Sequence, residues 1–469
     1  MGLLISILIF IKVLKQSYSH SNSETIVKKL FFTFLIIAFT RIAYAQIPEE
    51  AFKLTNSMHD LWVNGETDKA LNASLKLYEL YPPFLTDRIH NTLSQQILRA
   101  EDSSQIFNYV DRLYQANNNE INELISPFYY WTKVRTTKNP EKLKQAFINL
   151  SETLSDSSNY SKMPERYCLL GINDLENSLV IDKQMRKDLL QKVIANLEKY
   201  PSLIKEVKGR GDIEERAWNR YLLAYSYYTL YNSYDKDGEY LVKAAAYSPD
   251  ILDMNVKHAY FYDAALLTRD TESIGYKSVY AKYLKENNQI EAAINLFTEI
   301  TFNSPTDENL KTLKELYNSI LQKEDFNTHW FKYINNMAKP TPAVIVDFTN
   351  EKLDLSKKPD TWVYIDVWGT WCVPCVKELP DLQSFYTNNS ADSVSNLKVY
   401  TFSYKSKELP KFMSENNYTF PVSEIDQEIT KKFEVKGFPT KILITPEGKY
   451  LVIPFNTDWK TYVKNYALL

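Results

Sequence analysis

The stretch that decides the fold of the C-terminal part reads WVYIDVWGTWCVPCVKELP and occupies residues 362–380. Its first six residues are dense in Val, Ile, Tyr and Trp, which is typical of a strand. The strand leads into Cys372 and Cys375, at the start of a predicted helix. Cys372 is therefore expected at the helix N-terminus, where free N–H groups and the helix dipole favour a thiolate.

Cys375 lies three residues after Cys372, one helical turn further on the same side, so the two thiols can close a small disulfide ring. Pro374 is tolerated between them, because N–H groups in the first turn have no partner inside the helix. Such a pair can instead bind zinc, but tetrahedral zinc needs four ligands. The third cysteine, Cys168, stands alone in an apolar segment, and the five histidines are scattered. The pattern predicts a redox-active Cys372–Cys375 disulfide, no metal site, and a buried, inert Cys168.

Two carboxylates lie close to this pair in the sequence. Asp366 stands six residues before Cys372, as the single charge in an otherwise apolar strand. Burial would raise its pKa, so that it could accept the proton of a buried thiol, and an unpaired buried charge would strain the fold. Glu378, three residues after Cys375, faces the same side of the helix and is a second candidate acceptor.

The surrounding pattern alternates strands with helices after a proline-punctuated joint at 339–342. This alternation predicts an α/β domain with a central sheet and helices on both faces. The expected strands are 343–348, 362–367, 397–403, 440–445 and 450–454, and the expected later helices are 408–416, 426–433 and 459–467.

From about residue 340 to 469 the chain resembles the TlpA/ResA-type thioredoxin-like family of extracytoplasmic disulfide reductases. The resemblance rests on the WCxPC motif at 371–375 and on GFPT at 437–440. It implies a thioredoxin-like fold, with Cys372 as the attacking nucleophile and Cys375 as the resolving cysteine. The other implied site residues are Asp366, matching the buried aspartate of thioredoxin; Glu378, matching the acidic residue of ResA-type members; Pro439, as a cis-proline that orients the substrate backbone; and Trp371, Pro374 and Phe438, as further substrate contacts.

A peroxiredoxin would need the pattern Pro-x-x-x-Thr/Ser-x-x-Cys around its reactive cysteine. Here Thr370 stands two residues before Cys372 rather than three, and the upstream position holds Asp366 instead of proline. The sequence therefore does not fit a peroxidase.

The first 45 residues have the pattern of a secretory leader. Two lysines at 28–29 precede an apolar run at 30–39, and the small-x-small site Ala43-Tyr44-Ala45 follows. The run is too short to span a bilayer, and Gln46 rather than cysteine would follow the cleavage, which disfavours a lipoprotein. A second apolar run at 2–11 suggests that the true start lies near Val27. The alternative is a short N-terminal core helix.

Residues 46–338 are predicted to be α-helical, since only 10 of the 469 residues are glycine and the apolar spacing is helical. Two segments, 65–82 and 288–305, can be aligned with each other. Each has a small residue (Ala70 or Ala293), then apolar positions, and a proline at its end. This resembles the second helix of a tetratricopeptide repeat; a plain helical bundle is the alternative. Tyrosines at 221–231 could line a peptide groove or fill gaps between helices.

The chain is thus predicted to be multidomain, with a leader (1–45), an all-α TPR-like region (46–338) and an α/β thioredoxin-like domain (339–469). The predicted function is a secreted, periplasmic thiol–disulfide oxidoreductase that reduces disulfide-containing client proteins without a cofactor and is re-reduced by a membrane thiol donor. A formal charge of −3 with no long basic block gives no sign of nucleic-acid binding. The alternative is a helical peptide-binding scaffold whose thioredoxin domain is client-specific, oxidising or isomerising.

Overall fold

The computed structural model describes residues 47–469, except for 101–102, 117, 156–161, 201–202, 204–208, 250–255, 257, 270–274, 321–323, 350, 392–395, 456 and 469. The predicted leader and its cleavage site lie outside the described residues. Within the described part of the chain, no helix is both long and apolar enough to cross a membrane.

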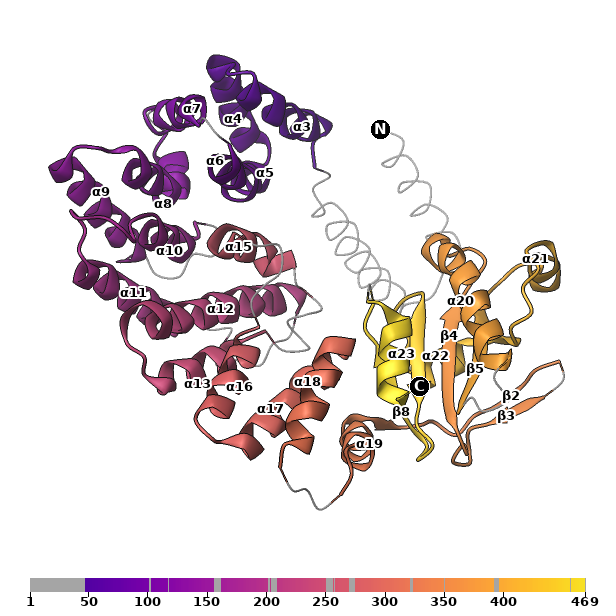
Figure 1. The fold of residues 1–469 in the computed structure, drawn as a ribbon. Helices are drawn as coiled ribbons and strands as arrows, with labels where there is room; N and C mark the ends of the chain where they lie inside the picture. Colours follow the sequence, from indigo (N-terminus) through magenta and orange to yellow (C-terminus); the bar gives the residue numbers. More distant parts are fainter. Residues whose placement is uncertain are drawn as a thin grey trace, which may run out of the picture. The chain divides into compact units, whose positions relative to one another are not determined.

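The chain packs as two compact units that divide after Lys183. In the first unit, consecutive helices pack against each other (indigo to purple in Figure 1). The pairs α3 with α4 and α8 with α9 are examples. Its helices are α3 (Glu49–Val63), α4 (Thr67–Leu80), α5 (Pro82–Asp87), α6 (Ser94–Arg99), α7 (Ser104–Tyr114), α8 (Asn119–Thr136), α9 (Pro140–Glu152) and α10 (Pro164–Asp174), with a π-helical turn at Arg88–Leu93.

The second unit begins with further helices and ends with the sheet domain. In the described part of 46–338, the region predicted to be all-α consists of helices joined by turns and short loops, without a strand. The helices are α11 (Lys183–Leu197), α12 (Arg210–Thr229), α13 (Gly238–Tyr247), α15 (His258–Thr268), α16 (Tyr276–Glu286), α17 (Ile290–Asn303), α18 (Asp307–Asn318) and α19 (Phe326–Met337).

The two segments that resemble repeat helices form α4 and α17. Ala70 and Ala293 are fully buried, as close helix packing requires. Each helix ends two residues before its proline, Pro82 or Pro305. The helical packing is confirmed, while membership of a defined repeat family stays a prediction.

The tyrosines of α12 fill space between helices. Tyr221, Tyr225 and Tyr227 are buried, and the ring of Tyr221 stacks on that of Tyr260 in α15 at 5.2 Å between ring centroids. These contacts favour the packing interpretation over a tyrosine-lined groove at these positions.

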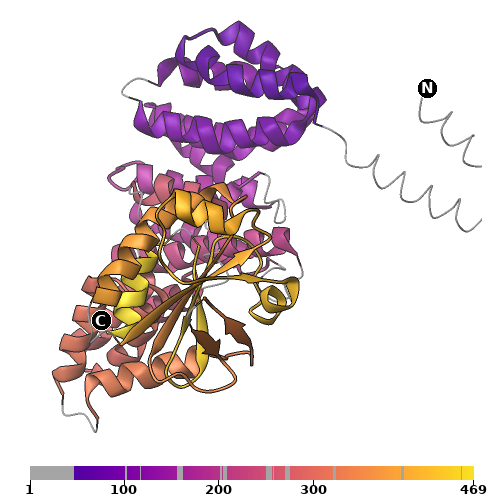
Figure 2. The ribbon, with the colours of Figure 1, turned by 90° about the vertical axis from the view of Figure 1, so that its right-hand side faces the viewer.

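The C-terminal part folds around a six-stranded sheet in the order β1-β8-β7-β4-β5-β6. Strands β4, β5 and β6 are parallel, and β7 runs antiparallel to β4 and to β8. Figure 2 shows these strands fanning out, as expected for a twisted sheet. The strands are β1 (Lys339–Pro340), β4 (Trp362–Trp368), β5 (Leu397–Tyr404), β6 (Val422–Ile425), β7 (Thr440–Ile444) and β8 (Lys449–Ile453); the helices are α20 (Val373–Ala391), α21 (Leu409–Glu415), α22 (Gln427–Lys432) and α23 (Trp459–Ala467).

The predicted elements agree closely with this domain. Strands β4, β5, β7 and β8 and helices α21 to α23 lie within one residue of their predicted ends. The strand predicted at 343–348 shrinks to β2 (Ile345–Asp347), which pairs only with β3 (Lys352–Asp354) in a separate two-stranded sheet. Strands β1, β3 and β6 were not predicted, because runs of two to four residues carry too little alternation to be recognised.

The two faces of the sheet carry different layers of the core. Alternate residues of β4 point to opposite faces, as strand geometry requires. Val363, Ile365 and Val367 belong to one apolar cluster, and Tyr364 and Trp368 belong to the other, together with Cys372, Cys375 and residues of α23. Asp366 lies between Tyr364 and Trp368 in this alternation, so it faces the layer that contains both cysteines.

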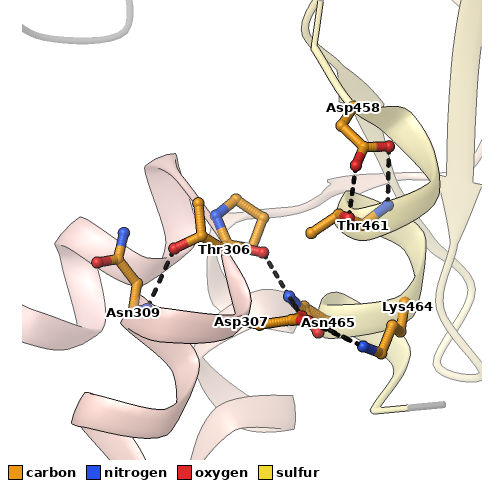
Figure 3. A network of polar contacts seen from close by, with 8 residues as sticks. Thr306, Asp307, Asn309, Asp458, Thr461, Lys464 and Asn465 are labelled. Atoms are coloured by element: carbon orange, nitrogen blue, oxygen red, sulfur yellow. Dashed lines mark hydrogen bonds and ion pairs between the residues drawn. The ribbon is translucent and has the colours of Figure 1, made fainter. Parts of the chain in front are cut away.

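This layer continues into the preceding helices without a break. Trp330 of α19, fully buried, donates its indole N–H to the carbonyl oxygen of Asn465 in α23 at 3.0 Å. The Asn465 side chain in turn donates to the carbonyl of Pro305 at 2.6 Å and to Asp307 at 2.9 Å. Lys464 forms an ion pair with Asp307, and Figure 3 shows this network between α18 and α23. The predicted domain boundary between residues 338 and 339 coincides with the change from helix to strand. Side chains from the two sides of this boundary nevertheless pack together.

Candidate active site

Strand β4 delivers the two cysteines to the start of α20. After Trp368 the chain turns, and the N–H of Cys372 donates to the carbonyl of Gly369 at 3.0 Å. Cys372 directly precedes the first helical residue, and its carbonyl accepts the N–H of Val376 at 3.0 Å. Its sulfur accepts the N–H of Cys375 at 3.3 Å. The sulfur of Cys372 thus lies at the helix N-terminus as predicted, where an N–H group and the helix dipole stabilise negative charge.

Cys372 and Cys375 are joined by a disulfide with an S–S distance of 2.04 Å. Both residues are buried. The predicted pairing is therefore present, while the separate roles of the two cysteines stay predictions. Cys168 is buried in the first unit, and its thiol donates to the carbonyl of Leu150 at 3.5 Å, as expected of an inert cysteine.

An aromatic rim lies beside the disulfide. The Trp371 side chain is exposed (53%), and its ring meets that of Phe438 edge-on at 5.2 Å. Phe438 also stacks on Tyr404 at the end of β5, at 5.4 Å. The Phe438–Pro439 peptide bond is cis, as the resemblance implied. Of the predicted substrate contacts, Trp371 and Pro374 are exposed, Phe438 is partly exposed, and the Pro439 side chain is buried.

Gly369 makes room for the exposed tryptophan. The indole N–H of Trp371 donates to the carbonyl of Tyr404 at 2.9 Å. A Cβ added at Gly369 would lie 2.6 Å from the indole nitrogen and 2.8 Å from that carbonyl oxygen, so both would have to move. Sequence reasoning missed Gly369 and Tyr404, because the close approach joins the β4–α20 turn to a different strand.

A lysine connects the two predicted carboxylates. Lys441 of β7 is the register partner of Asp366 in β4, and its Nζ lies 3.8 Å from Oδ2 of Asp366. The same Nζ lies 2.5 Å from Oε2 of Glu378 on α20. Asp366 (2% exposed) and Lys441 (7% exposed) are both buried, whereas the Glu378 side chain is 40% exposed.

Burial raises the pKa of Asp366 to about 6, the positive charge of Lys441 lowers it, and the negative charge of Glu378 raises it. The predicted raised pKa is thus confirmed. The expectation that Asp366 is an unpaired charge is wrong, because the ammonium group of Lys441 on the neighbouring strand lies close to its carboxylate. The signal that could have found Lys441 is a charged residue in a predicted buried strand, two positions after Pro439.

The arrangement is suited to thiol–disulfide exchange. It combines a disulfide at a helix N-terminus, an accessible apolar rim, and a carboxyl group whose pKa lies near neutrality on the same side of the sheet as both cysteines. A thiolate formed at Cys372 can attack an external disulfide, and a nearby base can take the proton of Cys375.

Comparison with known proteins places this site among similar domains. Residues 337–451 match the AhpC/TSA family. Thiol-disulfide oxidoreductase ResA of Bacillus subtilis is 29% identical over 127 residues, which is 27% of this chain and 70% of that protein. Sporulation thiol-disulfide oxidoreductase A of the same organism is 32% identical over 128 residues, covering 26% of this chain and 77% of that protein. The crystal structure of StoA from Bacillus subtilis matches 26% of this chain and 99% of its own, with 24% identity and a TM-score of 0.23.

Proposed function

Because the C-terminal part of this chain belongs to the thioredoxin-like thiol–disulfide oxidoreductases, the family of ResA and StoA, we propose that it reduces disulfide bonds in other proteins outside the cytoplasm. The observation that carries the proposal is the Cys372–Cys375 disulfide at the start of α20, next to the loop of Phe438 and Pro439.

The reaction begins from the reduced dithiol. The Cys372 thiolate attacks one sulfur of a client disulfide, and the leaving client sulfur takes a proton. This step forms a mixed disulfide between Cys372 and the client. Cys375 then loses its proton to a carboxylate and attacks the Cys372 sulfur, which releases the second client sulfur as a thiolate that takes a proton. Two electrons have passed to the client, and the chain is left with its own disulfide.

The client is proposed to be a protein segment rather than a small thiol. The surface beside the disulfide carries accessible apolar side chains, with Trp371 and Val373 among the most exposed large hydrophobic residues of the described part of the chain. Such a surface can cover an extended peptide while Cys372 reaches its disulfide. A membrane thiol donor would supply the electrons for the next cycle, since the site itself carries two cysteines and no further reductant.

The extracytoplasmic location rests on the leader pattern of residues 27–45. It entails cleavage between Ala45 and Gln46. The intact mass of the exported protein tests this, and an exported chain that still carries residues 30–39 would contradict it.

Insulin reduction tests the catalytic proposal. The purified, dithiothreitol-activated protein should precipitate the insulin B chain, Cys372→Ser should abolish this, and Cys375→Ser should accumulate mixed disulfides. Cys168→Ser, which removes the buried thiol of the first unit, serves as the control and should leave the rate unchanged. Equal trapping by both active-site variants would contradict the assigned roles. A wild-type protein that oxidises reduced clients but leaves insulin intact would contradict the reductive direction.

A further inference from the structure

Positive charge gathers around the aromatic rim beside the disulfide. Three segments contribute to this part of the surface: the turn and first helical residues at 369–377, the end of β5 with the following loop at 404–408, and the loop around the cis-proline at 434–440. They carry four lysines, all of them exposed, which we call the rim lysines. These are Lys377, Lys405, Lys407 and Lys436. The whole chain has a formal charge of −3, so the positive excess is local.

Contacts between the three segments make them parts of one site. The N–H of Thr370 donates to the hydroxyl oxygen of Ser406 at 2.9 Å. The Phe438 ring contacts the rings of Trp371 and Tyr404. The lysines of all three segments therefore flank the same pair of cysteines.

The carboxylates of these segments do not neutralise the rim lysines. Glu408 pairs with Lys411 at 3.3 Å, and Glu434 pairs with Lys339 at 2.6 Å. Within the described part of the chain, none of the four rim lysines forms an ion pair. Their ammonium groups are thus available to a negative partner from outside.

Lys405 is the rim lysine whose charge lies closest to the aromatic rings. It directly follows β5 with a left-handed backbone (φ 50°), and its Nζ lies over the Tyr404 ring, 5.1 Å from the ring centroid. Attraction between the ammonium group and the ring favours this position. Because the Tyr404 ring also stacks on Phe438, the charge of Lys405 lies at the edge of the surface that receives the client.

Lys377 extends the positive charge along α20. It lies four residues after Val373, so the two side chains share one helix face. Val373 is exposed beside the disulfide, and Lys377 is exposed one turn further on. A client segment that covers Val373 therefore meets a second ammonium group.

We propose that the site selects client segments in which aspartates or glutamates flank the disulfide, with Lys405 as a specificity-determining residue. The proposal rests on the function proposed above and names the class of substrate. The apolar rings cover the peptide around its disulfide, while the unpaired ammonium groups attract the flanking carboxylates and raise the rate of encounter. Anionic lipid is attracted by the same charges, but these lysines lie around a redox disulfide, so the chemistry favours a protein segment.

Two disulfide peptides of the same length test the proposal, one with three aspartates beside its cysteines and the other with three lysines at the same positions. The reduced full chain should reduce the acidic peptide about tenfold faster than the basic one at low salt, measured as second-order rate constants. This ratio should approach one as salt rises from about 0.01 M to 1 M, because the screening length falls from ~30 Å to ~3 Å.

Substitutions of Lys405 should change this ratio in a graded way. Lys405→Gln should lower it about threefold, Lys405→Glu should lower it further, and Lys405→Arg should preserve it. Lys377→Gln is a second, independent variant and should also lower the ratio. Lys398→Gln is the matched control, because Lys398 is exposed at the opposite end of β5 and forms no ion pair with a described residue. A general effect of any variant on the cysteines cancels, since the ratio compares two peptides on the same protein.

Equal rates for the two peptides at low salt would overturn the inference and leave the proposed function standing, as would an unchanged ratio in Lys405→Glu. If neither peptide is reduced, the proposed function is wrong, and binding decides the inference. Peptides with serine in place of both cysteines, titrated into the oxidised protein and followed by tryptophan fluorescence, should then show the same preference for the acidic sequence. Binding to phosphatidylglycerol vesicles without any preference between the peptides would overturn the inference in favour of a membrane surface.

Discussion

The carboxyl group of Asp366 lies in the apolar layer between the sheet and α20, and burial raises its pKa to about 6. In the unfolded chain the same group titrates near 3.9. Between these two values the folded state binds a proton that the unfolded state has lost, so the contribution of Asp366 to stability falls as pH rises through this window. Above pH 6 the charged form destabilises the fold by its full amount, and below pH 4 it contributes nothing.

Asp366→Asn should therefore stabilise the disulfide form by about 2–3 kcal/mol at pH 8, since each pH unit of difference corresponds to ~1.4 kcal/mol. The gain should shrink through pH 6 and vanish near pH 4. Guanidinium denaturation at a series of pH values measures it. Asp381→Asn, which changes an exposed carboxylate on α20, is the control and should show no such trend. If the wild type is the more stable protein at pH 8, favourable interactions offset the cost of burying the Asp366 charge more fully than its pKa indicates.

At this scale the sequence predicted what is local and missed what depends on strand pairing. Cys372, Cys375 and Asp366 stand within one short stretch, so their spacing predicted their placement, and Pro439 followed from the resemblance. Lys441 could not be placed, because only the β4–β7 register brings it opposite Asp366.

At the scale of elements, the β4–α20 turn brings the backbone close to a neighbouring strand and a side chain of the site. Its shape depends on Gly369, where any side chain would press on the Trp371 indole and on the backbone of β5. The absence of a side chain at Gly369 therefore leaves room for the Trp371 ring, which is held by its hydrogen bond to Tyr404 and its contact with Phe438.

Gly369→Ala should break the hydrogen bond from Trp371 to Tyr404, destabilise the domain by ~1–3 kcal/mol and slow insulin reduction. Thermal unfolding measures the loss of stability, and the tryptophan emission of the folded protein reports the broken hydrogen bond. Gly437→Ala, in the loop before Pro439, is the matched control, because a Cβ there meets no atom within 4 Å. Equal effects of the two substitutions would mean that chain entropy, not the close approach, governs this turn.

Most elements of the C-terminal domain were predicted from sequence to within one residue, because strands such as β4 and helices such as α23 carry clear apolar patterns. The short strands β1, β3 and β6 depend on neighbours that are distant in the chain, and no local pattern distinguishes them. Helix α20 continues through Pro380, which a local rule would treat as an end; packing of its apolar face outweighs the lost hydrogen bond.

At the scale of the whole molecule, helices α16 to α19 and the sheet domain share one apolar core within the second unit. Trp330 and Ile334 of α19 belong to the same cluster as Leu443 of β7 and Val463 of α23. Hydrogen bonds from Asn465 and Tyr466 to backbone carbonyls of 302–305 close the joint. We therefore expect α17 to α19 to unfold together with α23.

Trp330→Ala in the full chain should destabilise the second unit by ~3–5 kcal/mol, because it leaves a cavity and frees the Asn465 carbonyl. Amide hydrogen exchange should accelerate in α23 as well as in α19. Trp218→Ala, at an equally buried tryptophan of α12, is the control and should accelerate exchange in α12 without a selective effect on α23. Faster exchange confined to α19 would show that the two parts unfold independently.

The joint between α18, α19 and α23 also has a consequence for the order of synthesis. Helix α19 leaves the ribosome while β1 to β8 and α23 are still unmade, so the indole N–H of Trp330 lacks its acceptor, the Asn465 carbonyl, until α23 has been translated. A nascent or prematurely ended chain would thus display this tryptophan and its apolar neighbours to chaperones and proteases, whereas a finished chain hides them. Burial of Trp330 therefore distinguishes a chain that has folded through α23 from one that has not, before any disulfide chemistry begins.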